Sequence, residues 1–198
     1  ERLIQRLRET GEPDPVVVLQ GAPAPAAHDR FRQYNDLMYL APAEAPHAYL
    51  LVDGRGGQVV TTLYLASQSK ESAETDGPHL SSSDVDTALA VTGVDRVKDL
   101  SEMGAALERV KVIFTAFRPG EGSRESWDTL QRARAGVFSD PWDGRLDRAA
   151  RFVQLLRERY PSARVLDVSA HLDALRLVKS PAEVELLRRA GELSARGL

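Results

Sequence analysis

Short apolar runs that alternate with helix-like segments constrain the fold of this chain more than any other feature of its sequence. Residues 16–19 (VVVL) form an unbroken, β-branched run, which is typical of a strand buried on both faces of a sheet. Residues 47–53 and 58–65 are two further runs separated by the glycine-rich stretch GRGG, and they predict a β-hairpin. Strands are also predicted over residues 110–117 and 164–168.

The segments between these runs have the spacing of helices. Leu3, Ile4 and Leu7 share one face of a helix predicted at the start of the chain. Ser83 is expected to cap the helix that follows it. Strands interleaved with helices predict an α/β domain with a mixed sheet covered on both faces. The predicted helices cover residues 1–10, 84–91, 101–109, 125–135, 146–160 and 170–177, with an irregular or briefly helical segment at 31–40 and an exposed loop with a helical turn at 67–83.

Composition excludes several classes of protein. The chain has 198 residues and a formal net charge of −3, from 26 basic and 29 acidic side chains. That balance gives no electrostatic reason to expect a nucleic acid or an anionic lipid as a partner. No stretch approaches the roughly 20 apolar residues that span a membrane. The chain has no cysteine, so it has no disulfide and no thiolate metal site, which is compatible with the cytoplasmic location that we expect.

The C-terminal segment has the signature of a separate helix. Ser180 is placed to cap it, Pro181 suits the first helical position, and Glu183 completes a capping box. Val184 and Leu187 then lie along one side of the helix, but no later segment of the chain remains to cover its far end. The pattern leaves two interpretations open: the first helix of a second, mostly absent domain, or a terminal helix docked on the preceding domain.

No constellation of residues predicts a catalytic, cofactor-binding or metal-ligating site, and we assign none to this chain. The four histidines lack a second histidine or a carboxylate at metal-site spacing. The glycines of residues 54–57 are not followed by a helix, as a phosphate-binding loop requires. Trp142 lies in a polar loop, where a large aromatic side chain could contact a partner or fold back onto the core, and of the two we favour the core. The histidines are His28, His47, His79 and His171, and the other aromatic candidates are Phe31, Tyr34, Tyr39 and Trp127.

Two stretches resemble the N-terminal domains of aminopeptidase P, prolidase and creatinase-type metallopeptidases. Residues 31–40 (FRQYNDLMYL), followed by 47–52 (HAYLLV), are similar to the family's FRQ…DFxYLTG…P.A.LLL signature. Residues 175–190 (LRLVKSPAEVELLRRA) are similar to the LRxxKSPAEIxxxRxA junction at which the family passes into its catalytic domain. A weaker similarity, to TLFL…(W)DGPRLG, covers residues 62–65 and 76–80.

The resemblance implies a three-layer α/β/α fold with a mixed, ribonuclease-H-like sheet. It implies a non-catalytic N-terminal domain over residues 1–176. Residues 177–198 are then a linker and the first helix of a catalytic pita-bread domain that is otherwise missing. In the family, that catalytic domain holds two divalent metal ions, commonly manganese, and cleaves peptides, often before proline. The N-terminal domain shapes the active-site entrance and builds dimer or tetramer contacts. Its expected partners are therefore its own catalytic domain, a peptide substrate at the domain interface and further copies of itself.

Two departures from the family pattern bear on the activity. Ala41 and Pro42 replace the family's Thr-Gly, and Thr75 stands where many relatives carry a tryptophan before Asp-Gly. In those relatives the aromatic side chain helps to close a neighbouring subunit's active site, so the resemblance alone leaves both that contact and strict Xaa-Pro specificity open for this chain. The fragment alone is not expected to be an enzyme, whereas the full protein is expected to be a hydrolase. Two alternatives remain open: an interaction module of a metal-free pseudo-peptidase, and the N-terminal domain of a creatinase-like amidinohydrolase.

Overall fold

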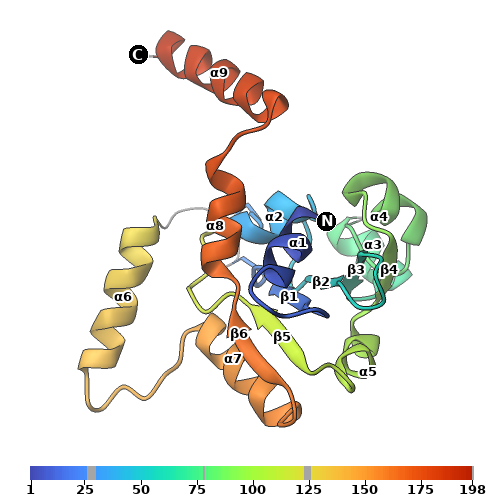
Figure 1. Ribbon diagram of the computed structural model, residues 1–198. Coiled ribbons are helices and arrows are strands. Elements are labelled where there is room, and N and C mark those ends of the chain that lie inside the picture. The colour runs from blue at the N-terminus through green and yellow to red at the C-terminus, as the bar shows by residue number, and fades with distance from the viewer. Residues whose placement is uncertain (26–29, 78, 123–125, 198) are drawn as a thin grey trace.

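The structure, a computed structural model, describes residues 1–25, 30–77, 79–122 and 126–197 (Figure 1). Six strands form one sheet in the order β4-β3-β2-β1-β5-β6. β2 pairs antiparallel with β1 and β3, whereas the β3–β4, β1–β5 and β5–β6 pairs are parallel. The strands are β1 (Val16–Gln20), β2 (Tyr49–Asp53), β3 (Val60–Leu65), β4 (Arg96–Asp99), β5 (Val112–Thr115) and β6 (Arg164–Asp167).

Helices cover both faces of this sheet. One hydrophobic core lies between the sheet and α1, α2, α4 and α8, and a second lies between the opposite face and α5 and α7. The sequence pattern predicts this mixed sheet covered on both faces, and the family resemblance implies the three-layer α/β/α arrangement, so both expectations are confirmed. The helices are α1 (Arg2–Arg8), α2 (Asn35–Leu40), α3 (Lys70–Asp76), α4 (Val85–Thr92), the 3₁₀ turn η1 (Leu100–Glu102), α5 (Met103–Leu107), α6 (Trp127–Ser139), α7 (Arg148–Arg159), α8 (Ser169–Leu177) and α9 (Pro181–Arg196).

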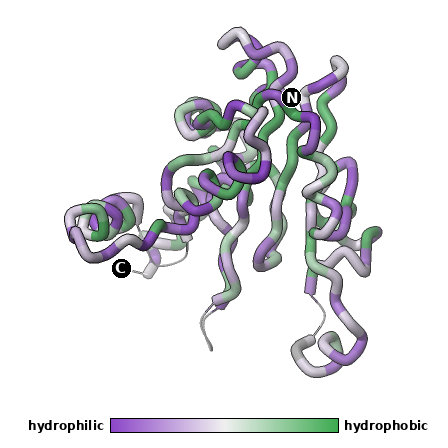
Figure 2. The backbone as a smooth tube through the Cα atoms, turned by 90° about the horizontal axis from the view of Figure 1, so that it is seen from below, coloured by the Kyte–Doolittle hydropathy of each residue, from purple (hydrophilic) through white to green (hydrophobic). Residues whose placement is uncertain are grey.

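β1 lies in the middle of the sheet and contributes to both cores. Val17 and Leu19 belong to one core, and Val16 and Val18 to the other, because successive side chains of a strand point to opposite faces. All four are essentially inaccessible to solvent, so the prediction of a strand buried on both faces is confirmed. Along the backbone, the hydrophobic stretches gather in the sheet and in the helix faces next to it (Figure 2).

The predicted hairpin is also present. β2 and β3 pair from Tyr49 opposite Tyr64 to Asp53 opposite Val60. The turn between them needs two residues in the left-handed region. Gly56 and Gly57 supply these with φ values of +71° and +87°, which side chains with a Cβ rarely adopt.

The structure corrects three details of the sequence-based assignment. β4 was not predicted, and residues 67–83 contain a seven-residue helix, α3, rather than a loop with a single helical turn. Asp84, not Ser83, caps α4, because its Oδ1 accepts from the backbone N–H of Thr87 at 3.1 Å. The Ser83 hydroxyl instead bonds the backbone of Gln68. Across the described ranges, no helix is both long and apolar enough to cross a membrane.

Candidate functional site

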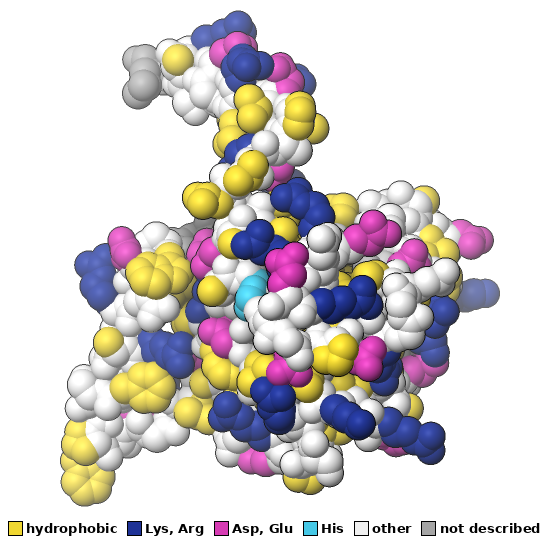
Figure 3. Space-filling model, in the orientation of Figure 1, with side chains coloured by type: hydrophobic (Ala, Val, Ile, Leu, Met, Phe, Trp, Pro, Cys, Tyr) yellow, Lys and Arg dark blue, Asp and Glu magenta, His cyan; other side chains and the backbone are white. Residues whose placement is uncertain are grey.

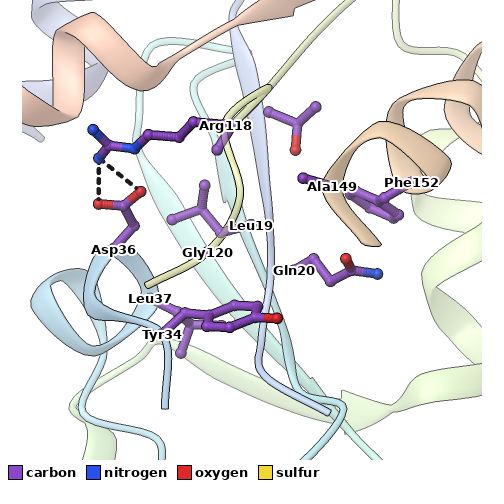
Figure 4. Close-up of a pocket in the computed structure, with 11 residues that line it drawn as sticks. Leu19, Gln20, Tyr34, Asp36, Leu37, Arg118, Gly120, Ala149 and Phe152 are labelled. Atoms are coloured by element: carbon purple, nitrogen blue, oxygen red, sulfur yellow. Dashed lines mark hydrogen bonds and ion pairs between the residues drawn. The ribbon is translucent and has the colours of Figure 1, made fainter. Parts of the chain in front are cut away.

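A small cavity opens at the carboxyl ends of the parallel neighbours β1 and β5 (Figure 4). Open α/β sheets commonly bind ligands at this edge. Leu19, Leu37 and Phe152 form apolar parts of its wall, and Tyr34 and Arg118 line it at opposite ends. The cavity volume is about 40 Å³, which is room for about one water molecule and not for a peptide. The cavity is therefore a gap in the packing beside a polar cluster, not a substrate pocket.

Arg118, in the loop after β5, joins two carboxylates from different helices. Its Nη2 atom donates to both oxygens of Asp36 in α2 at 2.9 and 3.0 Å, and its Nη1 atom donates to both oxygens of Asp173 in α8 at 2.6 and 2.7 Å. The Arg118 and Asp36 side chains are only 13% and 15% exposed. Burial lowers the pKa of Arg118, but the hydrogen bonds to Asp173 and the attraction of Asp36 outweigh it, so that pKa is raised.

Arg176 extends this cluster to the end of α8. Its Nη1 atom donates to Asp36 Oδ1 at 2.9 Å, and the Tyr39 hydroxyl donates to the carbonyl oxygen of Leu175 at 3.2 Å. The two stretches that carry the family resemblance, residues 31–40 and 175–190, therefore meet in space. We call the four charged side chains Asp36, Arg118, Asp173 and Arg176 the Arg118 clamp. The clamp fixes the direction in which α8 leaves the domain.

The helix that follows, α9, has no buried residue in its described part. Its capping box is present as predicted: the Ser180 hydroxyl accepts from Glu183 N–H at 3.3 Å, and the Glu183 carboxylate accepts from Ser180 N–H at 2.8 Å. Apolar side chains gather on α9 and at its approach (Figure 3). An amphipathic helix with a bare apolar side indicates a missing partner. The exposed apolar residues are Leu177, Val178, Val184, Leu186, Leu187 and Leu193.

Gln33 gives the FRQ stretch a structural role. Its side chain is 1% exposed and makes four hydrogen bonds. The Oε1 atom accepts from the backbone N–H groups of Ala22 at 2.6 Å and Tyr34 at 3.0 Å. The Nε2 atom donates to the carbonyl oxygens of Ala43 at 2.9 Å and Ala45 at 3.0 Å. One amide thus ties together the loop after β1, the start of α2 and the segment before β2.

The histidines do not form a shared site in the part of the chain that the structure describes. His47 accepts from the backbone N–H of Ala24 at 3.3 Å. The backbone N–H of His79 donates to Gln68 Oε1 at 3.2 Å, and that of His171 donates to the carbonyl oxygen of Val168 at 3.0 Å. His28 lies outside the described residues. Within residues 1–25, 30–77, 79–122 and 126–197, no group of three or more histidine or acidic side chains could hold a metal ion. The resemblance implies two metal ions in the catalytic half of the family, and the residues of these ranges do not fit a metal ion.

The aromatic candidates separate into two groups. Tyr34 and Tyr39 are half-buried around α2, whereas Trp127 is 49% exposed and Trp142 is 94% exposed. The prediction that Trp142 folds back onto the core is wrong. Asp140 accepts a hydrogen bond from the Trp142 backbone N–H at 2.9 Å, and the resulting turn presents the indole ring to solvent.

Sequence reasoning missed the Arg118 clamp. Arg118 is 82 residues from Asp36 and 55 from Asp173, and Arg176 is 140 residues from Asp36. No local pattern marks ion pairs of that separation. The available signal was indirect, since Asp36 and Arg176 lie inside the two stretches that carry the resemblance.

A mixed six-stranded sheet between two layers of helices, with α8 held by the Arg118 clamp, defines the class of protein as a three-layer α/β/α domain. Residues 1–112, more than half of the chain, match the family model described as aminopeptidase P, N-terminal domain. The chain therefore belongs to the family of aminopeptidase P N-terminal domains.

Individual relatives point to the same family. The chain is 26% identical over 196 residues to human Xaa-Pro aminopeptidase 3, covering 94% of this chain and 34% of the relative. The mouse protein of that name is 26% identical over 171 residues, covering 83% of this chain and 29% of its own length. The chain thus spans about a third of the length of these curated relatives.

Solved structures share the fold. Aminopeptidase P from E. coli with the inhibitor Pro-Leu superposes with a TM-score of 0.64 at 22% identity, covering 98% of this chain and 42% of that one. A Pseudomonas aeruginosa aminopeptidase gives a TM-score of 0.66 at 20% identity, covering 98% and 41%. A zinc-substituted form of the E. coli enzyme, in complex with product, is similar to the same extent.

Proposed function

We propose that this chain is the N-terminal, non-catalytic domain of a metal-dependent aminopeptidase of the Xaa-Pro type. In this proposal residues 1–176 form the domain, and residues 177–198 are the linker and first helix of a catalytic half. The N-terminal domain shapes the entrance for a peptide substrate and contributes contacts between copies of the protein. The catalytic half carries two divalent metal ions, commonly manganese, and the protein works in the cytoplasm.

The single observation that carries this proposal is the exposed apolar side of α9 behind the Arg118 clamp. Leu187 and Leu193 are 58% and 61% exposed on a helix that begins with a complete capping box, and only residues 178–180 separate it from α8. A helix of this kind is stable in a protein only when its apolar face is covered. A catalytic half attached after α9 would supply that cover, and the lengths of the relatives leave room for it.

Activity of the full-length protein that contains this chain is the direct test. The full-length protein and the 198-residue chain are assayed with added manganese on an Xaa-Pro peptide and on a dipeptide without proline. We expect turnover by the full-length protein and none by the chain alone, and the preferred peptide reports the proline specificity. Turnover by the purified chain would contradict the proposal. A full-length protein that stays inactive on both peptides would favour a pseudo-peptidase or a creatinase-like substrate.

A separate experiment tests whether a catalytic half covers the apolar side of α9. Leu187→Ser should destabilise the full-length protein by about 2 kcal/mol, because it places a hydroxyl in an apolar contact. It should leave the 198-residue chain unchanged, because Leu187 already faces solvent there. Glu192→Gln, at an exposed polar position of the same helix, is the matched control and should be neutral in both proteins. Equal effects of Leu187→Ser in both proteins would argue against a covering domain.

A further inference from the structure

A second surface of the chain lacks a partner. We call residues 126–147, which comprise α6 and the loop that leads to α7, the α6 arm. α6 has 13 residues and none of them is buried, and the helix stands apart from the sheet and its covering helices (Figure 1). Apolar side chains gather on it in Figure 3. Trp127, Phe138 and Leu146 are 49%, 60% and 42% exposed, so the arm has an apolar surface without any core beneath it.

The arm is nonetheless held in a defined position. Arg134 in α6 donates to the carbonyl oxygen of Phe117, next to the end of β5, at 3.0 Å. The same side chain pairs with Asp147 at 3.3 Å, and its guanidinium lies 5.4 Å from the centre of the Phe138 ring. Arg134 therefore connects the body of the domain, the helix and the end of the loop. A surface fixed in this way loses little conformational entropy when it binds.

An apolar groove runs along the inner side of α6. Leu130, Ala133 and Val137, at helical spacing, form one wall, and Pro119 and Leu146 contribute to the other. The groove has a volume of about 320 Å³. Pockets of about 300 Å³ are large enough to enclose a small ligand, so the groove has room for one large side chain.

A matching side chain projects from the same arm. Trp142 is 94% exposed and sits in a turn fixed on both sides. Asp140 Oδ1 accepts from the Trp142 backbone N–H at 2.9 Å. Asp143 Oδ1 accepts from the backbone N–H and the Nε of Arg145, and its Oδ2 accepts from Arg145 Nη2. The hydrogen bonds from Arg145 lower the pKa of Asp143 to about 2, so this pair stays charged and closed at neutral pH.

The charges of the arm favour an identical partner over a strongly charged one. The arm has three arginines and four aspartates, which gives a net charge of −1. Two of the arginines already pair with aspartates of the arm, in Arg134–Asp147 and Arg145–Asp143. Two such surfaces repel each other little, because their charges are mixed and nearly balanced. An acidic or basic partner would gain little from the same surface.

We propose that the α6 arm is a docking surface for a second copy of this chain, in which Trp142 of each copy enters the groove beside α6 of the other. A projection and a recess on one patch are what a two-fold symmetric interface requires, because both copies use the same surface. The α6 arm would then make the contacts between copies that the proposed function includes. Only the role of the oligomer depends on that function, whereas the contact itself does not.

The exposed apolar area of the α6 arm is large enough for a dimer interface. An aromatic side chain buries about 150–250 Å², so the exposed parts of Trp127, Phe138, Trp142 and Leu146 amount to roughly 500 Å² per copy. A symmetric pair would then bury about 1,000 Å² from these residues alone, which reaches the lower limit of specific interfaces. Central tryptophans of such interfaces commonly dominate the binding energy.

Sedimentation equilibrium of the 198-residue chain tests the proposal. We expect association of the unmodified chain, weakened at least about 30-fold by Trp142→Ser, the loss typical of a hot-spot residue. Val91→Ser, a matched change at a residue 55% exposed on α4, and Leu193→Ser on α9 should change the dissociation constant less than about 3-fold. Circular dichroism confirms that each variant keeps its helices. A chain that stays monomeric, or a dimer abolished by Leu193→Ser and not by Trp142→Ser, overturns the proposal.

Fluorescence provides an independent readout of the same contact. The chain has two tryptophans, so Trp127→Phe leaves Trp142 as its sole indole emitter. Its emission should move to shorter wavelength as concentration rises, because the ring passes from water into the groove of the other copy. Emission that stays constant through the concentration range of dimerisation would overturn the proposal. These results do not depend on catalysis, so an inactive full-length protein that still dimerises through Trp142 would reject only the proposed activity.

Discussion

At the scale of single residues, Gln33 shows how one buried amide connects three segments of chain. Its four hydrogen bonds reach Ala22, Tyr34, Ala43 and Ala45, and these backbone groups belong to loops that no strand or helix satisfies. A buried polar group that loses its partner costs more than a hydrogen bond contributes. The loops around α2 therefore depend on this side chain, although it belongs to no active site.

Replacing Gln33 should have a large effect on stability. Gln33→Leu keeps a similar volume but leaves the Ala45 carbonyl oxygen and the Ala22 backbone N–H group without the partners they have now, so we expect a loss of about 3 kcal/mol in the free energy of unfolding. Urea unfolding followed by circular dichroism measures it. Gln5→Leu, at an exposed position of α1, is the control and should stay within about 0.5 kcal/mol. Equal stability of the two variants would show that other groups satisfy these loops.

The Arg118 clamp should contribute more than an exposed ion pair. Arg118→Met removes the guanidinium but keeps an apolar stem beside the cavity, and it leaves Asp36 paired with Arg176. We expect a loss of about 2 kcal/mol, because the Arg118 and Asp36 side chains are mostly buried. Lys98→Met breaks the exposed Lys98–Glu102 pair and should cost about 0.5 kcal/mol or less. The free energy of unfolding of both variants, measured at low and at high salt, distinguishes a buried ion pair from an exposed one. If Arg118→Met lost as little stability as Lys98→Met, the clamp would contribute no more than an exposed ion pair.

At the scale of elements, the sequence predicts those that bury an apolar pattern. β1 and the β2–β3 hairpin follow from runs of apolar residues with clear turn signals. β4 escaped prediction because its sequence, RVKD, is mostly charged and only Val97 is buried. Charged side chains are common on edge strands because they discourage pairing with other chains. The clamp could not be predicted either, because its members come together only when the sheet is complete.

The start of α9 should respond to pH through its capping box. The hydrogen bond from the Ser180 backbone N–H lowers the pKa of Glu183 below its ordinary value of 4.5. The ionised form is therefore favoured in the helix, and its stabilisation is complete above the unfolded pKa and is lost as the pH falls through the folded one. Amide exchange of the first turn of α9 should accelerate as the pH is lowered from about 5 to about 3, after correction for the intrinsic exchange rate.

Glu183→Gln is the control for this titration. Glutamine can complete a capping box but does not ionise, so the corrected exchange rate should no longer depend on pH in that range. Ser180→Ala removes the other half of the box and should increase fraying at every pH. A first turn that frays equally in all three proteins would exclude a role for the capping box.

At the scale of the whole molecule, the chain combines a domain with closed hydrophobic cores and two helices whose apolar side chains are exposed. The two cores beside the sheet are closed by α1, α2, α4, α5, α7 and α8, whereas α6 and α9 have no buried residue. For α9 the sequence left open whether the helix docks on the preceding domain, and the structure shows that none of its described residues is buried. For α6 nothing in the sequence indicated an uncovered helix, because an amphipathic helix between two other elements is normally assumed to cover its own domain.

Removing α9 should leave the domain intact. A chain that ends at Lys179 loses a helix with no buried residue, so its free energy of unfolding should stay within about 0.5 kcal/mol of the original. The dependence of that free energy on urea should also change little, because it follows the surface exposed on unfolding. A loss of more than about 1 kcal/mol would show that α9 packs against the domain in solution.

The order of the strands has a consequence for how the chain acquires its shape. β1, β2 and β3 follow one another in sequence and pair in succession, whereas β5 joins the free edge of β1 only after residues 66–111 have been made. Contacts between neighbours in sequence form early, because closing a short loop costs less entropy. During synthesis, the three-stranded meander is therefore expected to precede the rest of the sheet and to serve as its template. Until β5 emerges, one edge of β1 is left open, and this is the stage at which a nascent chain of this kind is most exposed to mispairing.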